Sequence, residues 1–414
     1  MNRDAIGAAQ LDGLHALQRE LRAGNAFYGP RMATPFDTLA AFAEQVPFTV
    51  KADLAEDQRL HPPFGRNHTY PLDRYTRFCQ TSSTTGHPLR WLDTAESWGW
   101  MLDRWERVFA AAGVRAGDRV FFAFSFGPFL GFWTAFDAAT RMGCLAIPGG
   151  GMSSTARLRT LIDSGATVIC CTPTYAIRLG EAAQAEGVDL RASAVRTLVV
   201  AGEPGGSVPG TRALLQGLWP ETRIADHHGM TETGPVTYEC PLRTGVLHVM
   251  EPAFYAEIVD PQSGAPLEAG QSGELVLTNL GRTASPVVRY RTGDIVQPEA
   301  PGQCVCGSWE TALAGGILTR RDDMVIVRGV NIYPSAVEDV VRGCGEVAEY
   351  RVEVSTVRSM TEIRLVAEAE GETAHRLETA LRAAFGLRIP VAVAAAGTLP
   401  RFEMKARRWV RVTA

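Results

Sequence analysis

Short apolar runs that alternate with helical stretches restrict the fold of this chain more than any other feature. Two helical stretches, residues 153–164 and 174–186, lie between runs that resemble buried strands. Gly or Pro bounds each of these runs, which cover residues 120–125, 144–148, 167–172 and 197–201. Buried strands separated by helices are typical of βα units. The sequence therefore predicts an α/β fold with parallel or mixed βα sheets in its larger, N-terminal part.

The pattern changes after Cys240. Residues 246–249, 256–259 and 273–278 resemble antiparallel strands, with a Pro-Gln-Ser-Gly turn between two of them. We therefore expect a small antiparallel β insertion over about residues 240–306. Near the N-terminus, residues 11–21 are predicted to form a helix.

A last unit begins near Asp322. Its second helix carries Leu377, Leu381 and Phe385 at i, i+4 and i+8, which predicts one buried face. The sequence thus divides into a large N-terminal domain, residues 1–320, and a small α+β C-terminal domain, residues 321–414. In this second domain we expect strands at 324–327, 350–354, 362–367 and 390–394, and a first helix at 335–342.

Composition excludes several classes of protein. The net charge is −4 and no block of Lys and Arg occurs, which argues against a nucleic-acid-binding protein. Met1–Asp4 is followed by no apolar signal region, and no run of 18 apolar residues occurs, so we expect a cytoplasmic protein without a membrane partner. The eight cysteines are then expected to be thiols or metal ligands rather than disulfides.

Only two of the 41 basic residues are lysines, Lys51 and Lys405. Lysine is a compact point charge on a flexible stem, whereas arginine is a planar fork. A reaction that stabilises moving negative charge at one point, such as acyl or phosphoryl transfer, favours a lysine. The alternative for Lys405, nine residues from the C-terminus, is a solvated lysine of the tail.

Residues 81–88, Thr-Ser-Ser-Thr-Thr-Gly-His-Pro, form a hydroxyl-rich stretch. Its hydroxyls and successive backbone N–H groups can hold a polyphosphate. A generic Ser/Thr-rich surface loop is the alternative. The stretch lacks the Gly-Lys-Ser/Thr of a P-loop, which disfavours a P-loop ATPase.

Two further stretches carry carboxylates. Residues 226–232, Asp-His-His-Gly-Met-Thr-Glu, follow a predicted strand and end in a glutamate that can bind Mg²⁺, with an aromatic ring that can stack on a base. Residues 289–294, Arg-Tyr-Arg-Thr-Gly-Asp, end in an aspartate suited to the two hydroxyls of a ribose. An ordinary turn and a salt-bridged turn aspartate are the respective alternatives.

These stretches, in this order and at these separations, resemble the core motifs of the adenylate-forming (acyl-CoA synthetase) superfamily. Residues 320–334 resemble its hinge and C-domain loop, and Lys405 falls where that family has its catalytic lysine. The phenylacetate-CoA ligase branch is indicated by residues 127–129, 147–150, 172–175 and 201–204. The resemblance covers the chain from about residue 75 to its end.

The resemblance implies ATP-dependent formation of an acyl-AMP, release of pyrophosphate, and transfer to a thiol. Lys405 would bridge the carboxylate and the α-phosphate, which is electrostatic catalysis. ATP phosphates would be held by Thr81, Ser82, Ser83, Thr84, Thr85, Gly86 and Thr231; adenine by Gly202, Glu203, Pro204, Asp226, His227 and His228; ribose by Asp294 and Arg320; Mg²⁺ by Glu232. Asp322 would be the hinge of the small, mobile C-terminal domain, and Arg328 and Gly329 would form the coenzyme A loop. The acyl pocket would be lined by Phe126, Phe129, Gly149, Gly150, Gly229, Met230 and Pro235.

Three positions depart from the family pattern. Ser83 replaces the usual glycine, His87 the usual lysine, and His228 the usual tyrosine before Gly229. The His87 change removes a charge near the γ-phosphate or makes it pH-dependent. The His228 ring is a smaller stacking surface than tyrosine. Both changes bear on ATP affinity.

Four residues have the spacing of metal ligands. Cys240 and His248 are separated by seven residues, and Cys304 and Cys306 form a Cys-x-Cys-Gly turn. One His and three Cys complete a tetrahedral structural zinc site, an arrangement that phenylacetate-ligase-like proteins often share. Unconnected surface residues are the alternative. The remaining cysteines are expected in the core: Cys79, Cys144, Cys170, Cys171 and Cys344.

Residues 121–136 form an aromatic-rich segment, most of whose rings are expected in the core. Residues 126–129 lie where the family lines its acyl pocket, and Gly149-Gly150-Gly151 leaves room for a flat ring. We therefore expect an aryl or arylacetic acid as substrate. Coenzyme A is the family's usual acceptor, with a carrier-protein thiol or an amine as the alternative. An ATP-dependent phosphotransferase or a non-catalytic zinc-stabilised binding module stays open as a remote alternative, and a homodimer is left open.

Overall fold

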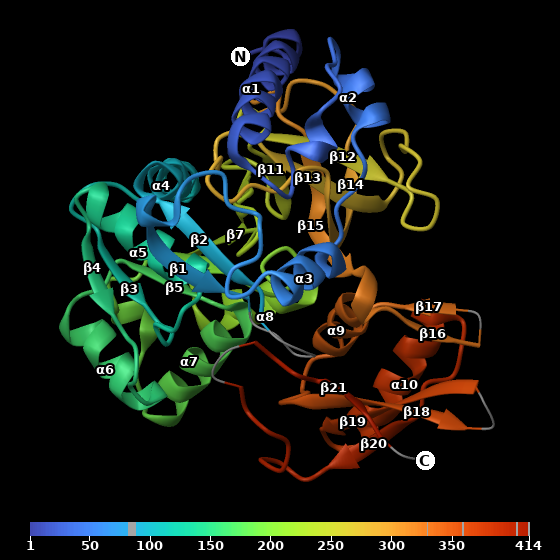
Figure 1. Cartoon of the computed structure of the whole chain (residues 1–414). Coiled ribbons are helices and arrows are strands. Elements are labelled where there is room, and N and C mark those ends of the chain that lie inside the picture. Colours follow the sequence, from blue (N-terminus) through green and yellow to red (C-terminus); the bar gives the residue numbers. More distant parts are fainter. Residues whose placement is uncertain (82–87, 329, 358–359, 403–404, 413–414) are drawn as a thin grey trace.

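The computed structural model of the chain describes residues 1–81, 88–328, 330–357, 360–402 and 405–412. Figure 1 shows the chain after about residue 320, in orange and red, as a lobe beside the larger part of the molecule. Within the described residues, no helix combines the length and the apolar character needed to cross a bilayer.

The predicted parallel sheet is confirmed. Its strands are parallel and follow the order β4-β3-β5-β6-β7. Fully buried residues such as Val120, Ile169 and Leu198 explain why the strands read as continuous apolar runs. The strands are β3 (Arg119–Phe122), β4 (Leu145–Pro148), β5 (Val168–Cys171), β6 (Thr197–Ala201) and β7 (Arg223–His227). The helices between them are α5 (Leu130–Arg141), α6 (Ser154–Asp163), α7 (Pro173–Ala185) and α8 (Pro209–Leu218), with η3 (Leu190–Ala192) before β6.

The predicted antiparallel strands also form, within a larger sheet of order β10-β11-β15-β14-β13-β12. The short strand at 237–239 was not predicted, nor were two long strands of this sheet, β14 (Tyr290–Pro298) and β15 (Ala312–Arg320). Their pairing shifts register at several points, and their Gly and Arg content hides the alternation that marks a strand. The others are β10 (Thr237–Glu239), β11 (Val246–Val249), β12 (Phe254–Val259) and β13 (Gly273–Asn279).

A hairpin brackets the hydroxyl-rich stretch. Strand β1 (Tyr75–Gln80) pairs antiparallel with β2 (Arg90–Thr94), so the two strands fix both ends of that stretch. Thr94 then caps α4 (Ala95–Ala111) by accepting a hydrogen bond from the Ser97 N–H. Two short strands, β8 (Gly229–Met230) and β9 (Gly234–Pro235), follow β7.

The N-terminal segment contributes helices that cover the antiparallel sheet (Figure 1). Helix α1 (Arg3–Gly24) is longer than the predicted helix at 11–21, because Asn2 caps it and its buried face begins at Ile6. It is followed by η1 (Pro30–Met32), α2 (Leu39–Gln45), α3 (Lys51–Leu60) and η2 (Leu72–Arg74).

The C-terminal lobe has the predicted α+β composition. A sheet of order β20-β19-β18-β21 packs with α10 (Gly371–Phe385), whose Leu377 and Leu381 are fully buried and whose Phe385 is half-buried. The other elements are η4 (Arg321–Asp323), β16 (Val325–Val327), β17 (Val330–Ile332), α9 (Pro334–Gly343), β18 (Tyr350–Val357), β19 (Met360–Glu368), β20 (Val391–Ala394) and β21 (Trp409–Arg411).

A fully buried ion pair joins β2 to the segment after β13. Arg282 donates from Nε and Nη2 to the two carboxylate oxygens of Asp93 at 2.7 and 2.6 Å. Its remaining Nη1 donates to the carbonyls of Thr231 at 2.7 Å and Glu232 at 3.1 Å. The guanidinium also lies 5.5 Å from the ring centre of Trp91. The pair therefore holds the main chain of the 226–232 stretch against the hairpin.

Asp93→Ala is expected to lower the free energy of unfolding by about 3–5 kcal/mol, because it leaves the Arg282 charge buried without a carboxylate. Denaturant unfolding followed by tryptophan fluorescence measures this. Glu56→Ala, which breaks the fully exposed pair with Arg59, is the matched control and should have no resolvable effect. Equal effects of the two substitutions would contradict a structural role for the buried pair.

Candidate active site

Lys405 lies against the loop that follows β6. A Cβ built on Gly202 would stand 3.5 Å from Lys405 Cε, and the neighbouring Ala406 N–H donates to Glu203 Oε2 at 2.8 Å. Lys405 retains an exposed surface, yet loss of solvent around its ammonium lowers its pKa, while the negative charge of Glu203 acts in the opposite direction. The lysine of the C-terminal lobe is therefore brought to the carboxyl edge of the parallel sheet.

Asp294 and Arg320 face each other across β14 and β15. Their Cα atoms are paired in the ladder, and Arg320 Nη1 donates to Asp294 Oδ1 at 3.1 Å. Burial raises the pKa of Asp294 to about 6. Its other oxygen, Oδ2, makes no hydrogen bond among the described residues, which leaves it able to accept one from a bound hydroxyl.

The His228 ring lies beside this oxygen, with Nε2 3.2 Å from Asp294 Oδ2. Burial lowers the pKa of His228 to about 3, so the ring is neutral and this approach is not an ion pair. Nε2 likewise has no hydrogen-bond partner among the described residues. His228 Nε2 and Asp294 Oδ2 are therefore both able to hydrogen-bond to a ligand.

Glu232 is buried at the other side of the site. Its Oε1 lies 3.4 Å from Lys51 Nζ and 3.4 Å from the Tyr290 hydroxyl. Lys51 is the first residue of α3, and its place at this site was not predicted from the sequence. The signal was present, since Lys51 and Lys405 are the only lysines in the chain and both lie at this site.

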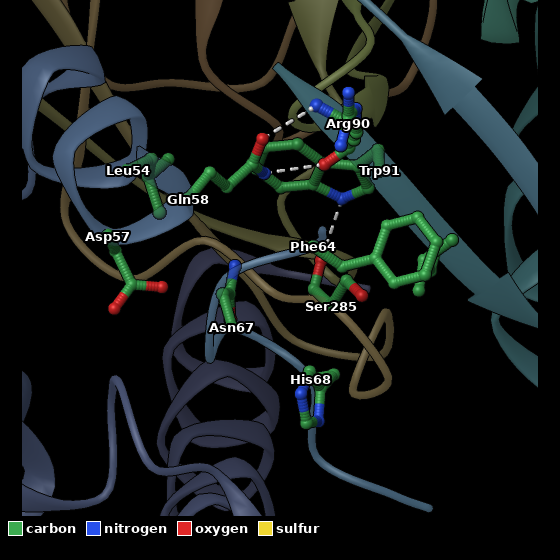
Figure 2. A pocket seen from close by; sticks show the side chains of 10 residues that line it. Leu54, Asp57, Gln58, Phe64, Asn67, His68, Arg90, Trp91 and Ser285 are labelled. Carbon is green, nitrogen blue, oxygen red and sulfur yellow. Dashed lines mark hydrogen bonds between the residues drawn. The ribbon is translucent and has the colours of Figure 1, made fainter. Parts of the chain in front are cut away.

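Helix α3 is fixed at both ends, which explains the position of Lys51. Just before the helix, Thr49 exchanges backbone hydrogen bonds with Arg289 and Arg291 at 2.9 Å each. Farther along, the Gln58 side chain bonds the backbone of Arg90 through Nε2–O (2.7 Å) and Oε1–N (2.9 Å), as Figure 2 shows. The helix is thus tied to β14 and to the exit of the hydroxyl-rich stretch.

The pocket in Figure 2 lies between α3 and β2 and is not a substrate site. Its free volume of about 10 Å³ leaves space for no more than a single water molecule. The Trp91 ring closes one side and donates through Nε1 to the Ser285 carbonyl at 3.0 Å. An aromatic acid does not fit there.

Asp226 and His227 are held by the protein itself. The Asp226 carboxylate accepts from Ser207 Oγ at 2.5 Å and from the His227 N–H at 2.9 Å, and burial raises its pKa to about 7. The His227 ring points to the other side of β7, where Nδ1 lies 2.9 Å from the Thr237 carbonyl oxygen and the ring packs on Trp105. Side chains alternate along a strand, so the His227 ring points away from the Asp226 carboxylate, and the expected adenine contact of His227 stays a prediction.

The expected acyl-pocket residues gather around α5. Phe126 and Phe129 are half-buried in an aromatic cluster, and a Cβ on Gly150 would lie 3.4 Å from the Phe126 ring. Helix α5 packs against β8 and β9, which carry Gly229, Met230 and Pro235.

At Gly149 the expected room for a ring is not present. A Cβ there would meet the Phe121 ring at 2.7 Å and the Phe122 carbonyl at 2.9 Å. Gly149 therefore lets its backbone pack closely on β3 instead of opening space for a substrate.

Other predicted residues lie at the edges of the site or outside the described chain. Thr81 closes its stretch by bonding Leu89 through both N–H···O (2.9 Å) and Oγ1 (3.0 Å). Arg328 has φ +52 and donates to Glu362 at 2.8 Å on the small lobe. Asp322 lies in η4, where β15 passes into the small lobe, and Pro204 follows Glu203. Outside the described residues lie Ser82, Ser83, Thr84, Thr85, Gly86, His87 and Gly329.

The four expected zinc ligands converge. Their ligand atoms all lie within 4.8 Å of one another, with Cys240 Sγ 3.7 Å from Cys304 Sγ and Cys306 Sγ 3.5 Å from His248 Nε2. A tetrahedral ion with zinc–sulfur bonds of about 2.3 Å requires S···S distances of about 3.8 Å, so the set fits zinc. His248 Nδ1 lies 3.2 Å from the Glu310 carbonyl, a contact that leaves Nε2 facing the Cys306 thiol.

Comparison with known proteins agrees with this geometry. The family model of AMP-binding enzymes matches residues 43–282, and that of the AMP-binding enzyme C-terminal domain matches residues 329–411. The phenylacetate-coenzyme A ligase of Pseudomonas putida is 31% identical over 399 residues, covering 91% of this chain and 85% of that protein. That of Thermus thermophilus is 34% identical over 333 residues, covering 78% and 71%.

Solved structures indicate the arrangement of the lobes. The chain superposes on a 2-hydroxyisobutyryl-CoA ligase in the postadenylation state with a TM-score of 0.92 at 26% identity, covering all of this chain and 90% of that one. The same ligase in the thioesterification state gives a TM-score of only 0.74. The lobes of this chain thus have the arrangement of the postadenylation state. By family model, sequence identity and fold, the chain belongs to the AMP-binding enzymes, in their phenylacetate-coenzyme A ligase branch.

Proposed function

We propose that this AMP-forming acid–thiol ligase activates an aromatic carboxylic acid with ATP, releases pyrophosphate, and transfers the acyl group to coenzyme A. The observation that carries the proposal is the convergence of Lys405 with Gly202, Glu203, Asp294 and Glu232 from distant parts of the sequence. A binding module would need no isolated lysine at that place.

ATP would be held by groups that now lack partners or carry compatible charge. Asp294 Oδ2 would accept a ribose hydroxyl, and the neutral His228 ring would lie against adenine. Glu232 would hold Mg²⁺, which supplies charge neutralisation at the phosphates. Mg²⁺ and the Lys51 ammonium would repel each other at the same Glu232 oxygen, so Lys51 would turn from Glu232 to the phosphates. There it would supply the positive charge that the family's usual lysine, replaced by His87 in this sequence, would otherwise provide.

Lys405 would act on the first half-reaction. When the carboxylate attacks the α-phosphorus, negative charge builds up between the two groups, and a point charge placed beforehand stabilises it without transferring a proton. Asp322, in the η4 turn between the lobes, would be the hinge that carries the C-terminal domain, residues 321–414, between the half-reactions. Arg328 and Gly329 would serve coenzyme A.

The aromatic cluster around Phe126 and Phe129 supports an aryl or arylacetic acid, as do the phenylacetate ligases among the relatives. A pyrophosphate-release screen over benzoic, hydroxybenzoic, aminobenzoic and phenylacetic acids, with and without coenzyme A, tests both substrate and acceptor. Turnover that needs a carrier-protein thiol or an amine instead would identify the alternative acceptor. ADP as product would exclude an adenylating ligase.

Lys405→Ala is expected to slow adenylation by about 100-fold or more, because it removes the stabilising charge, while thioester formation from supplied acyl-adenylate stays largely intact. Lys405→Arg, the matched control, keeps the charge but spreads it over a planar fork and should recover only part of the rate. Pyrophosphate exchange and thioester formation are measured separately. Equal loss in both half-reactions would sink the assignment.

The pH dependence of kcat/KM for ATP should reflect the ionisation of Asp294. Its pKa is raised to about 6, so lowering the pH through that value protonates the carboxyl and removes an acceptor for ribose. We expect kcat/KM for ATP to rise with pH through this range, and Asp294→Asn to be weak and insensitive there. A rise that survives in Asp294→Asn would instead assign the titration to Asp226, whose pKa is raised to about 7.

We also propose a structural Zn²⁺ bound by Cys240, His248, Cys304 and Cys306. The three thiolates and one imidazole would close its coordination shell, so the ion would hold β10 and β11 to the loop before β15 and take no part in the chemical step.

Metal analysis of protein purified without chelators should find about one zinc per chain. Cys304→Ser is expected to lower the melting temperature before it lowers affinity for the acid, since zinc binding stabilises only the folded state. Cys344→Ser, in the C-terminal lobe, is the control and should keep its zinc. Protein free of zinc would refute the site and leave the ligase proposal standing.

A further inference from the structure

The Glu203 carboxylate joins the two lobes beside Lys405. Its Oε1 accepts a hydrogen bond from the Thr174 N–H at 2.9 Å, in the first turn of α7. Its Oε2 accepts one from the Ala406 N–H at 2.8 Å. One carboxylate therefore links the N-terminal end of a helix in the large lobe to the main chain next to the lysine of the small lobe.

Positive groups flank the Glu203 side chain on two sides. The N-terminus of α7 carries partial positive charge and an exposed set of N–H groups, which stabilise an anion. The Lys405 ammonium lies on the other side and feels the Glu203 charge more strongly than that of Glu232 or Asp294. Glu203 is thus placed between two positive ends.

The contact fixes the main chain of the lysine segment and leaves the ammonium available. Lys405 Cε passes 3.5 Å from the position a Cβ would take on Gly202, while Nζ remains in the field of Asp294, Glu232 and Arg320. Both oxygens of Glu203 are already used by N–H groups of the protein. These two bonds fix the direction of the carboxylate.

We propose that Glu203 is a positioning residue that holds the Lys405 segment in place for adenylation only. This inference rests on the proposed role of Lys405. The Ala406–Glu203 bond spans the lobes, so it breaks when the small lobe turns to the arrangement of the thioester step, whereas the Thr174–Glu203 bond lies within the large lobe and persists. The anchor consequently favours one of the two arrangements.

The expected effect is moderate because Glu203 is half-buried and water can replace the lost acceptor. Glu203→Gln removes the charge and presents an amide N–H₂ to one of the two N–H groups. Glu203→Asp keeps the charge but is one methylene too short to bond both segments. Both substitutions should slow adenylation about tenfold, the scale of one charge-assisted hydrogen bond.

The test measures the two half-reactions and ATP binding separately. We expect a lower rate of pyrophosphate exchange, an unchanged dissociation constant for ATP, and unimpaired thioester formation from supplied acyl-adenylate. In a Lys405→Ala background, Glu203→Gln should have no further effect, because the segment no longer carries the group it positions. Asp339→Asn is the matched control: this carboxylate accepts from Gly210 N–H across the lobes at 2.7 Å, and its effect should add to that of Lys405→Ala.

Each other outcome overturns the proposal. Weaker ATP binding with normal turnover would make Glu203 an adenine ligand. Equal losses in both half-reactions, or losses that add to Lys405→Ala, would make it a general structural residue. Normal adenylation by Lys405→Ala would refute both the proposed function and the positioning role of Glu203. Normal adenylation by both Glu203 variants, with Lys405→Ala impaired, would refute the positioning role alone.

Discussion

The buried ion pair of Arg282 and Asp93 is the interaction on which the site depends. A guanidinium without exposed surface is costly unless all its donors are used, and here two bond the carboxylate while a third bonds the carbonyls of Thr231 and Glu232. The pair therefore fixes the main chain that presents the Glu232 carboxylate. The pair also ties that main chain to β2, the strand that follows the hydroxyl-rich stretch. The residues expected to bind magnesium and those expected to bind phosphate are therefore anchored by the same ion pair.

Positive and negative side chains are balanced at the site, an arrangement that suits a polyphosphate ligand. Lys51 from α3 and Lys405 from the small lobe approach the site from opposite ends of the sequence, and Arg320 joins them from β15. Glu232, Asp294 and Glu203 face these three cations. Each of the three cations thus has a carboxylate nearby. A bound Mg²⁺–ATP would exchange these contacts for stronger ones, since Mg²⁺ prefers carboxylate and phosphate oxygens.

Much of the fold could be predicted from the sequence, because buried parallel strands are continuous apolar runs; β6 and β11 have the predicted bounds. Strands β14 and β15 could not, because bulges and functional residues mask their alternation. The zinc ligands converge as their spacing indicated. The place of Lys51 depends on how α3 is tied to β14 and β2, contacts that no local pattern encodes. The same holds for the direction of the His227 ring, toward the Thr237 carbonyl, and for the tight packing of Gly149 on Phe121.

Transfer of isotope from the acid tests the central claim most directly. An aromatic acid labelled with oxygen-18 in its carboxylate is turned over with ATP and coenzyme A, and the phosphorus products are analysed by mass spectrometry. Attack of the carboxylate on the α-phosphorus, followed by transfer of the acyl group to the thiol with release of AMP, leaves one labelled oxygen in AMP and none in pyrophosphate. Label in orthophosphate, with ADP as product, or a thioester formed without labelled AMP, would contradict the account.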